Sequence, residues 1–155
     1  MSLDGWSEHD QSMMRAALAQ AERAATEDEV PVGAVVVSSG AIVGSGYNRT
    51  VKDHDPSAHA EIIAMRAAAL ALGNHRLPDA ALFVTLEPCS MCVGAMLQAR
   101  ISRVVFAAYD PVAGSVGSVV DLSAIPEFNH RIEVNGGLFA DQAGELLKRF
   151  FDARR

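Results

Sequence analysis

Two residues that can do metal and proton chemistry lie close together in "SAHAEII", residues 57–63. His59 offers an imidazole, a common metal ligand, and Glu61 offers a carboxylate that can carry protons. Successive residues of an α-helix are about 100° apart, so these side chains cannot share one face inside a helix, although both can reach a common object where a helix begins. The alternative is structural: His59 caps a helix, and Glu61 favours the positive end of the helix dipole.

The only two cysteines of the chain lie in a second stretch, "LEPCSMC", residues 86–92. Cys89 and Cys92 are three positions apart, which places two side chains on one face of a helix, and a helix N-terminus lowers the pKa of a thiol. Three chemistries fit such a pair. One is a redox dithiol, the second is structural zinc with four protein ligands, and the third is catalytic zinc with three protein ligands and an open position for water.

The apolar pattern predicts the elements that position these side chains. A stripe with helical spacing predicts the first helix, and two β-rich runs around "SSG" predict a hairpin. The predicted helices cover 7–29, 58–72, 88–100 (with Pro88 near its first position) and 141–155. The predicted strands cover 32–37, 41–45, 80–86, 102–109 and 131–138, and the segment 110–130 is predicted as loop with one helical turn near 119–122.

This order of elements predicts one α/β domain over residues 1–155, a three-layer α/β/α sandwich around a central mixed five-stranded sheet. The units that carry His59 and the cysteines would be neighbours, with their helix starts at one sheet edge. His59, Cys89 and Cys92 would then form a Cys₂His zinc set with an open fourth position. Two thiolates offset the zinc charge, so the water there is less acidified and Glu61 becomes useful as a base.

H-x-E followed by P-C-x-x-C is the signature of the zinc-dependent nucleoside and nucleobase deaminases. The stretches "VPVGAVVV", "GYNRT", "HDPSAHAEI" and "LFVTLEPCSMCVGAM" resemble the bacterial tRNA-specific adenosine deaminases of the cytidine and deoxycytidylate deaminase superfamily, and the similarity covers nearly the whole chain. The resemblance implies a cytidine-deaminase-like fold, one zinc ion per chain, a homodimer, and a tRNA anticodon stem-loop as the partner.

The implied reaction is hydrolytic deamination of the wobble adenosine to inosine with a zinc-activated water. Carried over to this sequence, the resemblance assigns zinc binding to His59, Cys89 and Cys92, and proton transfer to Glu61. A single-stranded loop suits this chemistry because its base is already partly unstacked and costs less to extrude.

The resemblance also implies substrate contacts. Asn48 would meet the flipped base, and Asp110 and Phe151 would lie at the anticodon loop. The sequence departs from the pattern at one place. Relatives often have D-x-K-x-G after the aspartate, whereas this chain has "DPVAG" with Val112 in place of the lysine. A positive charge that would face a phosphate is therefore missing there.

Composition bears on nucleic-acid binding and on cellular location. The formal charge of −6 speaks against binding of nucleic acid over a broad basic surface, although the tail 146–155 has four basic residues against one acidic residue. No apolar run reaches about 18 residues without polar breaks, so no membrane span is expected. The acidic start "MSLDGWSEHD" does not resemble a signal peptide, and two cysteines make no disulfide framework, so we expect a cytoplasmic protein.

Two other functions stay open at the level of sequence. A deaminase of a free nucleobase or nucleoside, such as guanine or cytosine, would use the same zinc site. A small pocket closed by the C-terminal segment would favour that function, and tight tRNA binding would exclude it. The third function is a zinc-stabilised, non-catalytic binding module. Glu61 speaks against it, because a purely structural zinc site needs no unliganded carboxylate.

Overall fold

The computed structural model describes Leu3 and residues 5–155, so part of the acidic segment 1–10 lies outside the described residues. The helices are α1 (Glu8–Thr26), α2 (Ala60–Leu72), α3 (Ser90–Ala99) and α4 (Ala140–Asp152). The strands are β1 (Gly33–Ser38), β2 (Ala41–Tyr47), β3 (Ala81–Leu86), β4 (Arg103–Ala108) and β5 (Glu133–Gly136). They form one sheet in the order β2-β1-β3-β4-β5.

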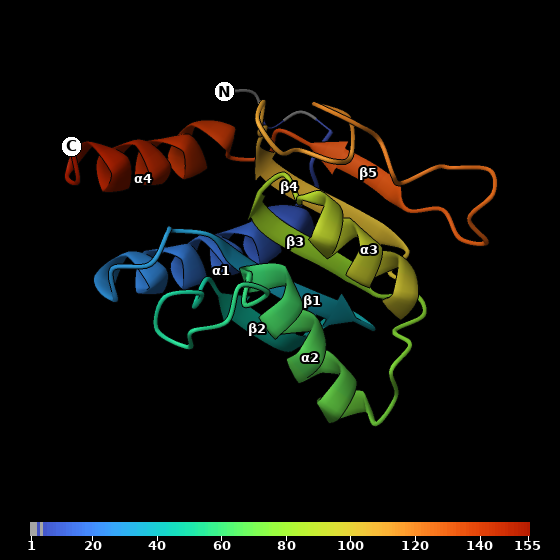
Figure 1. Ribbon diagram of the computed structural model, residues 1–155. Helices are drawn as coiled ribbons and strands as arrows, with labels where there is room; N and C mark the ends of the chain where they lie inside the picture. Colours follow the sequence, from blue (N-terminus) through green and yellow to red (C-terminus); the bar gives the residue numbers. More distant parts are fainter. Residues whose placement is uncertain (1–2, 4) are drawn as a thin grey trace.

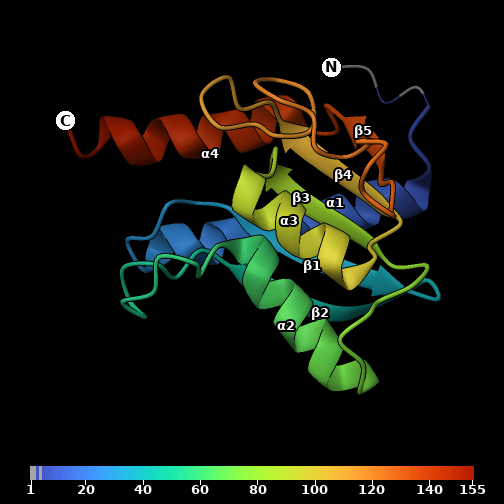
Figure 2. The same cartoon turned by 45° about the vertical axis from the view of Figure 1, so that its right-hand side comes forward.

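The helices lie in layers on the two faces of this sheet. Helices α1 and α4 cover one face, and α2 and α3 cover the other (Figure 1). The view turned by 45° shows the same layers (Figure 2). The predicted three-layer α/β/α sandwich with a mixed five-stranded sheet is therefore confirmed.

The central strands are mostly apolar because both of their faces are buried. On β1, Ala34 and Val36 pack in the core that includes residues of α2 and α3, whereas Val35 and Val37 pack in the core that includes residues of α1 and α4. Strands β3 and β4 alternate in the same way. A continuous apolar run is what a strand covered on both faces requires.

Strand directions decide where the site can form. Strand β1 is antiparallel to β2 and to β3, and β3, β4 and β5 are parallel, so every strand except β1 ends at the same edge of the sheet. We call this the carboxyl edge; α2 and α3 begin there. The prediction that the units carrying His59 and the cysteines are adjacent was wrong for the strands, since β1 separates β2 from β3. It holds for the helices, because α2 and α3 pack against each other.

Two local predictions were also wrong. Pro88 does not open α3: Cys89 is the N-cap and the helix begins at Ser90. No helical turn forms near residues 119–122 (described in full), because the N–H groups of Val119 and Val120 donate to the carbonyl oxygen of Gly114 instead of continuing a helix. The other elements match the prediction to within about three residues at each end, the variation expected of such boundaries.

Helix α2 approaches the sheet closely because glycine and alanine face each other. A Cβ atom added to Gly44 of β2 would lie 2.3 Å from the carbonyl oxygen of Ala64 and 2.6 Å from the nitrogen of Ala68. These are backbone atoms of α2, so they cannot rotate away. Since α2 also carries His59 at its start, this contact helps to fix the height of the candidate site above the sheet.

Gly44→Ala should therefore destabilise the protein, by about 1–3 kcal/mol as is typical of overpacked sites, because the new methyl group pushes α2 off the sheet. The matched control is Gly144→Ala in α4, where an added Cβ meets no atom within 4 Å. That change should stabilise the helix by roughly 0.5–1 kcal/mol. Denaturant unfolding measures both, and a Gly44→Ala protein as stable as the parent would contradict the packing argument.

Candidate metal centre

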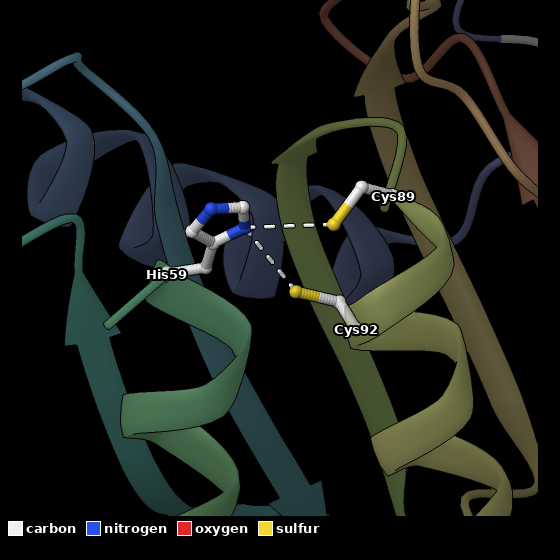
Figure 3. A group of neighbouring side chains, drawn as sticks. All are labelled: His59, Cys89 and Cys92. Carbon is white, nitrogen blue, oxygen red and sulfur yellow. Dashed lines mark hydrogen bonds between the residues drawn. The ribbon is translucent and has the colours of Figure 1, made fainter. Parts of the chain in front are cut away.

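His59 and Cys89 occupy equivalent positions, the N-caps of α2 and α3, both with extended backbone. Neither side chain makes a capping hydrogen bond, so the alternative in which the His59 imidazole caps its helix is not what the structure has. The side chains point toward each other between the two helix starts, and Cys92 in the first turn of α3 joins them (Figure 3). The structure thus brings together the three predicted metal ligands.

The three ligand atoms lie at distances that suit one zinc ion. Nδ1 of His59 is 3.6 Å from Sγ of Cys89 and 3.5 Å from Sγ of Cys92, and the three atoms all lie within 4.8 Å of one another. Ordinary Zn–N and Zn–S bonds at tetrahedral angles separate nitrogen from sulfur by about 3.5 Å. No fourth His, Cys, Asp or Glu among the described residues belongs to the group. Three protein ligands are typical of catalytic zinc.

The ligands influence one another's protonation. Hydrogen bonding with Cys92, helped by His59, lowers the pKa of Cys89 to about 4, and the same pairing together with burial raises the pKa of Cys92. Hydrogen bonding with Cys89 in turn raises the pKa of His59. A divalent cation would take the place of the protons that this cluster otherwise shares. A redox dithiol would need only the two sulfurs, whereas here an imidazole nitrogen faces both of them.

Glu61 is the fourth group of the site. It lies in the first turn of α2 and is 4% exposed. Burial raises the pKa of Glu61 to about 7, although its own backbone N–H and the charge of His59 oppose the shift. His59 and Cys89 both act electrostatically on its carboxyl group, yet Glu61 is not part of the ligand cluster. A carboxyl group with a pKa near neutrality can both accept and donate protons.

Asn48 lies at the same edge of the sheet, directly after β2. Its backbone N–H donates to the carbonyl oxygen of Val32, and the next N–H, of Arg49, donates to the carbonyl oxygen of Ala58. The segment that carries Asn48 is therefore bonded to the residue before His59. Asn48 itself is 9% exposed, and its side chain forms no hydrogen bond with another described residue.

Asp110 follows β4 and organises its own loop. Its carboxylate accepts hydrogen bonds from the N–H groups of Val112 and Ala113, at 3.0 and 3.2 Å. This is an Asx turn, the ordinary structural role of an aspartate before a proline-containing turn. Val112, which stands where relatives often have lysine, is 85% exposed on this loop.

Phe151 lies near the end of α4 and is 45% exposed, with its ring edge-on to Phe150 at 5.3 Å between centroids. One turn earlier on the same stripe of the helix, Leu147 packs against the core that includes residues of α2 and α3. Phe151, four residues after Leu147, continues the same stripe toward the end of the helix.

Two buried glutamates at this edge were not identified from the sequence. Glu29 is 1% exposed, and its carboxylate accepts from the N–H groups of Val51 and Lys52 in the loop after β2. Glu87 is 2% exposed and accepts from the loop after β4. Burial would raise the pKa of Glu87, but hydrogen bonds from Ser118 and its neighbours outweigh burial and hold it below the ordinary value. The available signal was a charged residue directly next to a buried apolar run.

Comparison with known proteins adds to this geometry. Residues 7–108 match the sequence model of the cytidine and deoxycytidylate deaminase zinc-binding region. A tRNA-specific adenosine deaminase from Haemophilus influenzae is 45% identical over 150 residues, which cover 96% of this chain and 87% of the relative.

Solved structures are similar as well. A structure from work on A-to-I editing by tRNA:A34 deaminases at the wobble position of transfer RNA has a TM-score of 0.85 at 44% identity, covering 88% of this chain and 99% of the other. A guanine deaminase from Nitrosomonas europaea has a TM-score of 0.75 at 27% identity, covering 90% of this chain and 83% of the other.

The purified protein should bind about one zinc ion per chain, because its three donors match one tetrahedral site. His59→Ala, Cys89→Ser and Cys92→Ser should each lose most of that metal, whereas the control Glu61→Gln should retain it. Metal analysis after dialysis against a weak chelator measures the occupancy. Full zinc content in Cys89→Ser would show that the donor set is assigned wrongly.

Proposed function

The chain belongs to the zinc-binding cytidine and deoxycytidylate deaminase family, and from that premise we propose that it deaminates adenosine to inosine at the wobble position of a tRNA anticodon. The observation that carries the proposal is a Cys₂His donor set beside a buried carboxyl group outside that set. The similar protein from Haemophilus influenzae and the tRNA:A34 deaminase structure support this choice of substrate.

In the proposed reaction, zinc held by His59, Cys89 and Cys92 would act as a Lewis acid that activates water. Glu61 accepts one proton from the attacking water and delivers it to N1 of adenine, then accepts the second proton from the new hydroxyl group on C6 and delivers it to the leaving amino group. The water oxygen bonds to C6 and the C6–N6 bond breaks. Adenosine and water therefore give inosine and ammonia, and no electrons are transferred.

The three other predicted residues, Asn48, Asp110 and Phe151, would contact the substrate. Asn48 offers an amide without an intramolecular partner among the described residues, suited to hydrogen bonds with a base. Asp110 can still accept a hydrogen bond from a ribose hydroxyl through the carboxylate oxygen that is not used in its Asx turn. Phe151 presents an exposed ring on which an unstacked base can lie.

The alternative, a deaminase of a free base, is favoured by the guanine deaminase structure at 27% identity. That alternative would gain support from a C-terminal segment that closes a small pocket. Helix α4 packs mainly on α1, β4 and β3, and its Leu147 reaches the core that includes residues of α2 and α3. Its end is held to the α1 side by an ion pair between Arg154 and Asp28, at 3.0 Å. His59 and Cys89 stay partly exposed, which favours a substrate that approaches from outside, such as an RNA loop.

The cellular location follows from the substrate. In the described part of the chain, no helix is both long enough and apolar enough to span a bilayer. We infer a cytoplasmic location, because tRNA is modified and used there.

We also propose a homodimer that buries the outer face of α2 and α3. A groove on this face is lined by Ile62, Met65, Ala69, Ala95 and Ala99, together with Arg66, His75 and Leu77. Its small residues allow a second copy to approach closely. Light scattering at micromolar concentration should give the mass of a dimer, and Ala95→Glu should give a monomer with an unchanged circular dichroism spectrum. A monomeric parent protein would contradict the proposal.

Glu61→Ala should retain zinc, fold and affinity for the anticodon stem-loop, yet lose turnover by at least about 10²–10⁴-fold, the usual contribution of a general acid–base group. His59→Ala should lose metal and activity together. If Glu61 only favoured the helix dipole, its removal would cost roughly 0.3–1 kcal/mol of stability and leave turnover intact.

The measurement is single-turnover conversion of adenosine to inosine in a tRNA pool, read by sequencing, with zinc content and melting temperature in parallel. Free adenosine, guanine and cytosine serve as competing substrates. Conversion of a free base with no change in the tRNA would overturn the proposed substrate, and near-parental turnover by Glu61→Ala would overturn the proton-transfer role.

A further inference from the structure

Glu87 connects two parts of the carboxyl edge that are far apart in the sequence. It stands between the end of β3 and the zinc donor Cys89, and its carboxylate accepts hydrogen bonds from the loop after β4. Oε1 accepts from the N–H of Asp110 at 3.1 Å and from the hydroxyl of Ser118, while Oε2 accepts from the N–H groups of Val116 and Ser118 at 3.3 and 3.1 Å. Both oxygens are therefore in use.

Backbone hydrogen bonds join the same two segments. The N–H of Glu87 donates to the carbonyl oxygen of Ala108 at 2.8 Å, and the N–H of Ser115 donates to the carbonyl oxygen of Pro88 at 2.9 Å. Hydrogen bonds thus join the turn at residues 87–88 to the loop at 108–118 near the start of the loop, at Ser115 and near its end.

Gly114 shows how closely the loop sits on the carboxylate. An added Cβ would lie 2.4 Å from Cδ of Glu87 and 2.5 Å from the carbonyl oxygen of Asp110. The φ angle of Gly114 is not in the left-handed region, so an alanine could adopt this backbone. Glycine is needed here for space alone, and a methyl group would have to push the loop away from Glu87.

We propose that Glu87 is a positioning residue that holds the 110–118 loop, with Asp110 and Val112, in a fixed place relative to the zinc donor Cys89. This rests on the proposed function, in which that loop contacts the RNA. Glu87 does not touch substrate in this scheme. It sets the distance between the loop that contacts the RNA and the zinc donors.

The central variant is Glu87→Gln, which keeps the shape of the side chain. Both carboxylate oxygens accept from backbone N–H groups, so either orientation of the amide turns its NH₂ toward at least one of them. Amide hydrogen exchange at Asp110, Val116 and Ser118 should accelerate by about tenfold or more, as expected from the loss of a hydrogen bond to a charged group. The Kd for an anticodon stem-loop, measured in the Glu61→Ala background, should rise by about tenfold, with zinc content unchanged.

Three further variants separate positioning from general stability. Gly114→Ala should reproduce the weaker RNA binding by steric displacement, with the Glu87 charge intact. Ser118→Ala removes one hydroxyl donor and should have a smaller effect in the same direction. Asp121→Asn is the matched control: this carboxylate caps Ser123 in the same long segment and makes no hydrogen bond to the turn at residues 87–88, so RNA binding should not change.

The proposal is overturned if Glu87→Gln and Gly114→Ala both bind RNA like the parent while only their melting temperatures fall. It is also overturned if amide exchange rises evenly over the whole chain. Should Glu87→Gln fail to fold, Gly114→Ala and Ser118→Ala decide the matter alone. Failure of the proposed function looks different: the parent would not convert tRNA or bind the stem-loop, whereas the exchange measurement needs no substrate.

Discussion

The close approach of two helix N-termini is the constraint on which this site depends. Helices α2 and α3 start at one edge because every strand except β1 ends there. Their N-cap residues, His59 and Cys89, point across the gap instead of capping their own helices. The glycine–alanine contact with β2 helps to set the height of α2, and the donor distances between the two helix starts fit one zinc ion.

Three glutamates are buried at this edge, and their surroundings give them different chemistry. Glu29 and Glu87 each accept hydrogen bonds from backbone N–H groups of a loop, and for Glu87 these bonds favour the ionised carboxylate. Glu61 has no such loop, and burial raises its pKa to about 7, whereas the pKa of Glu87 is lowered. When the surroundings push the pKa values of two carboxyl groups apart, the group with a pKa near neutrality suits acid–base chemistry, and the ionised group suits a structural role. The same type of side chain therefore suits proton transfer at position 61, the role proposed for it, and accepts the hydrogen bonds of a loop at position 87.

The sequence predicted most of the fold because the decisive patterns are local. Apolar runs marked β1, β3 and β4, and the H-x-E and P-C-x-x-C motifs marked the metal donors, which the structure brings together. The 110–130 segment could not be predicted in the same way, because its conformation depends on bonds to Glu87 and Pro88, more than 20 residues earlier in the chain. The predicted position of Pro88 also failed, since helix periodicity does not show whether a proline lies inside the first turn or just before the cap.

Charge distribution then bears on how an RNA would be held. The basic tail looks strong in the sequence, but Arg154 is paired with Asp28 and lies over the ring of Phe150, and Arg155 is paired with Asp152. Lys148 and Arg149 have no ion pair among the described residues, and Val112 supplies no charge on the loop after β4. Each phosphate contact contributes about 0.7 to the salt dependence of single-strand binding, so two unpaired cations in this tail would add only a shallow dependence. In the proposed function, contacts to unstacked bases would then have to supply what the tail does not, and a single-stranded anticodon loop offers such bases whereas a duplex does not.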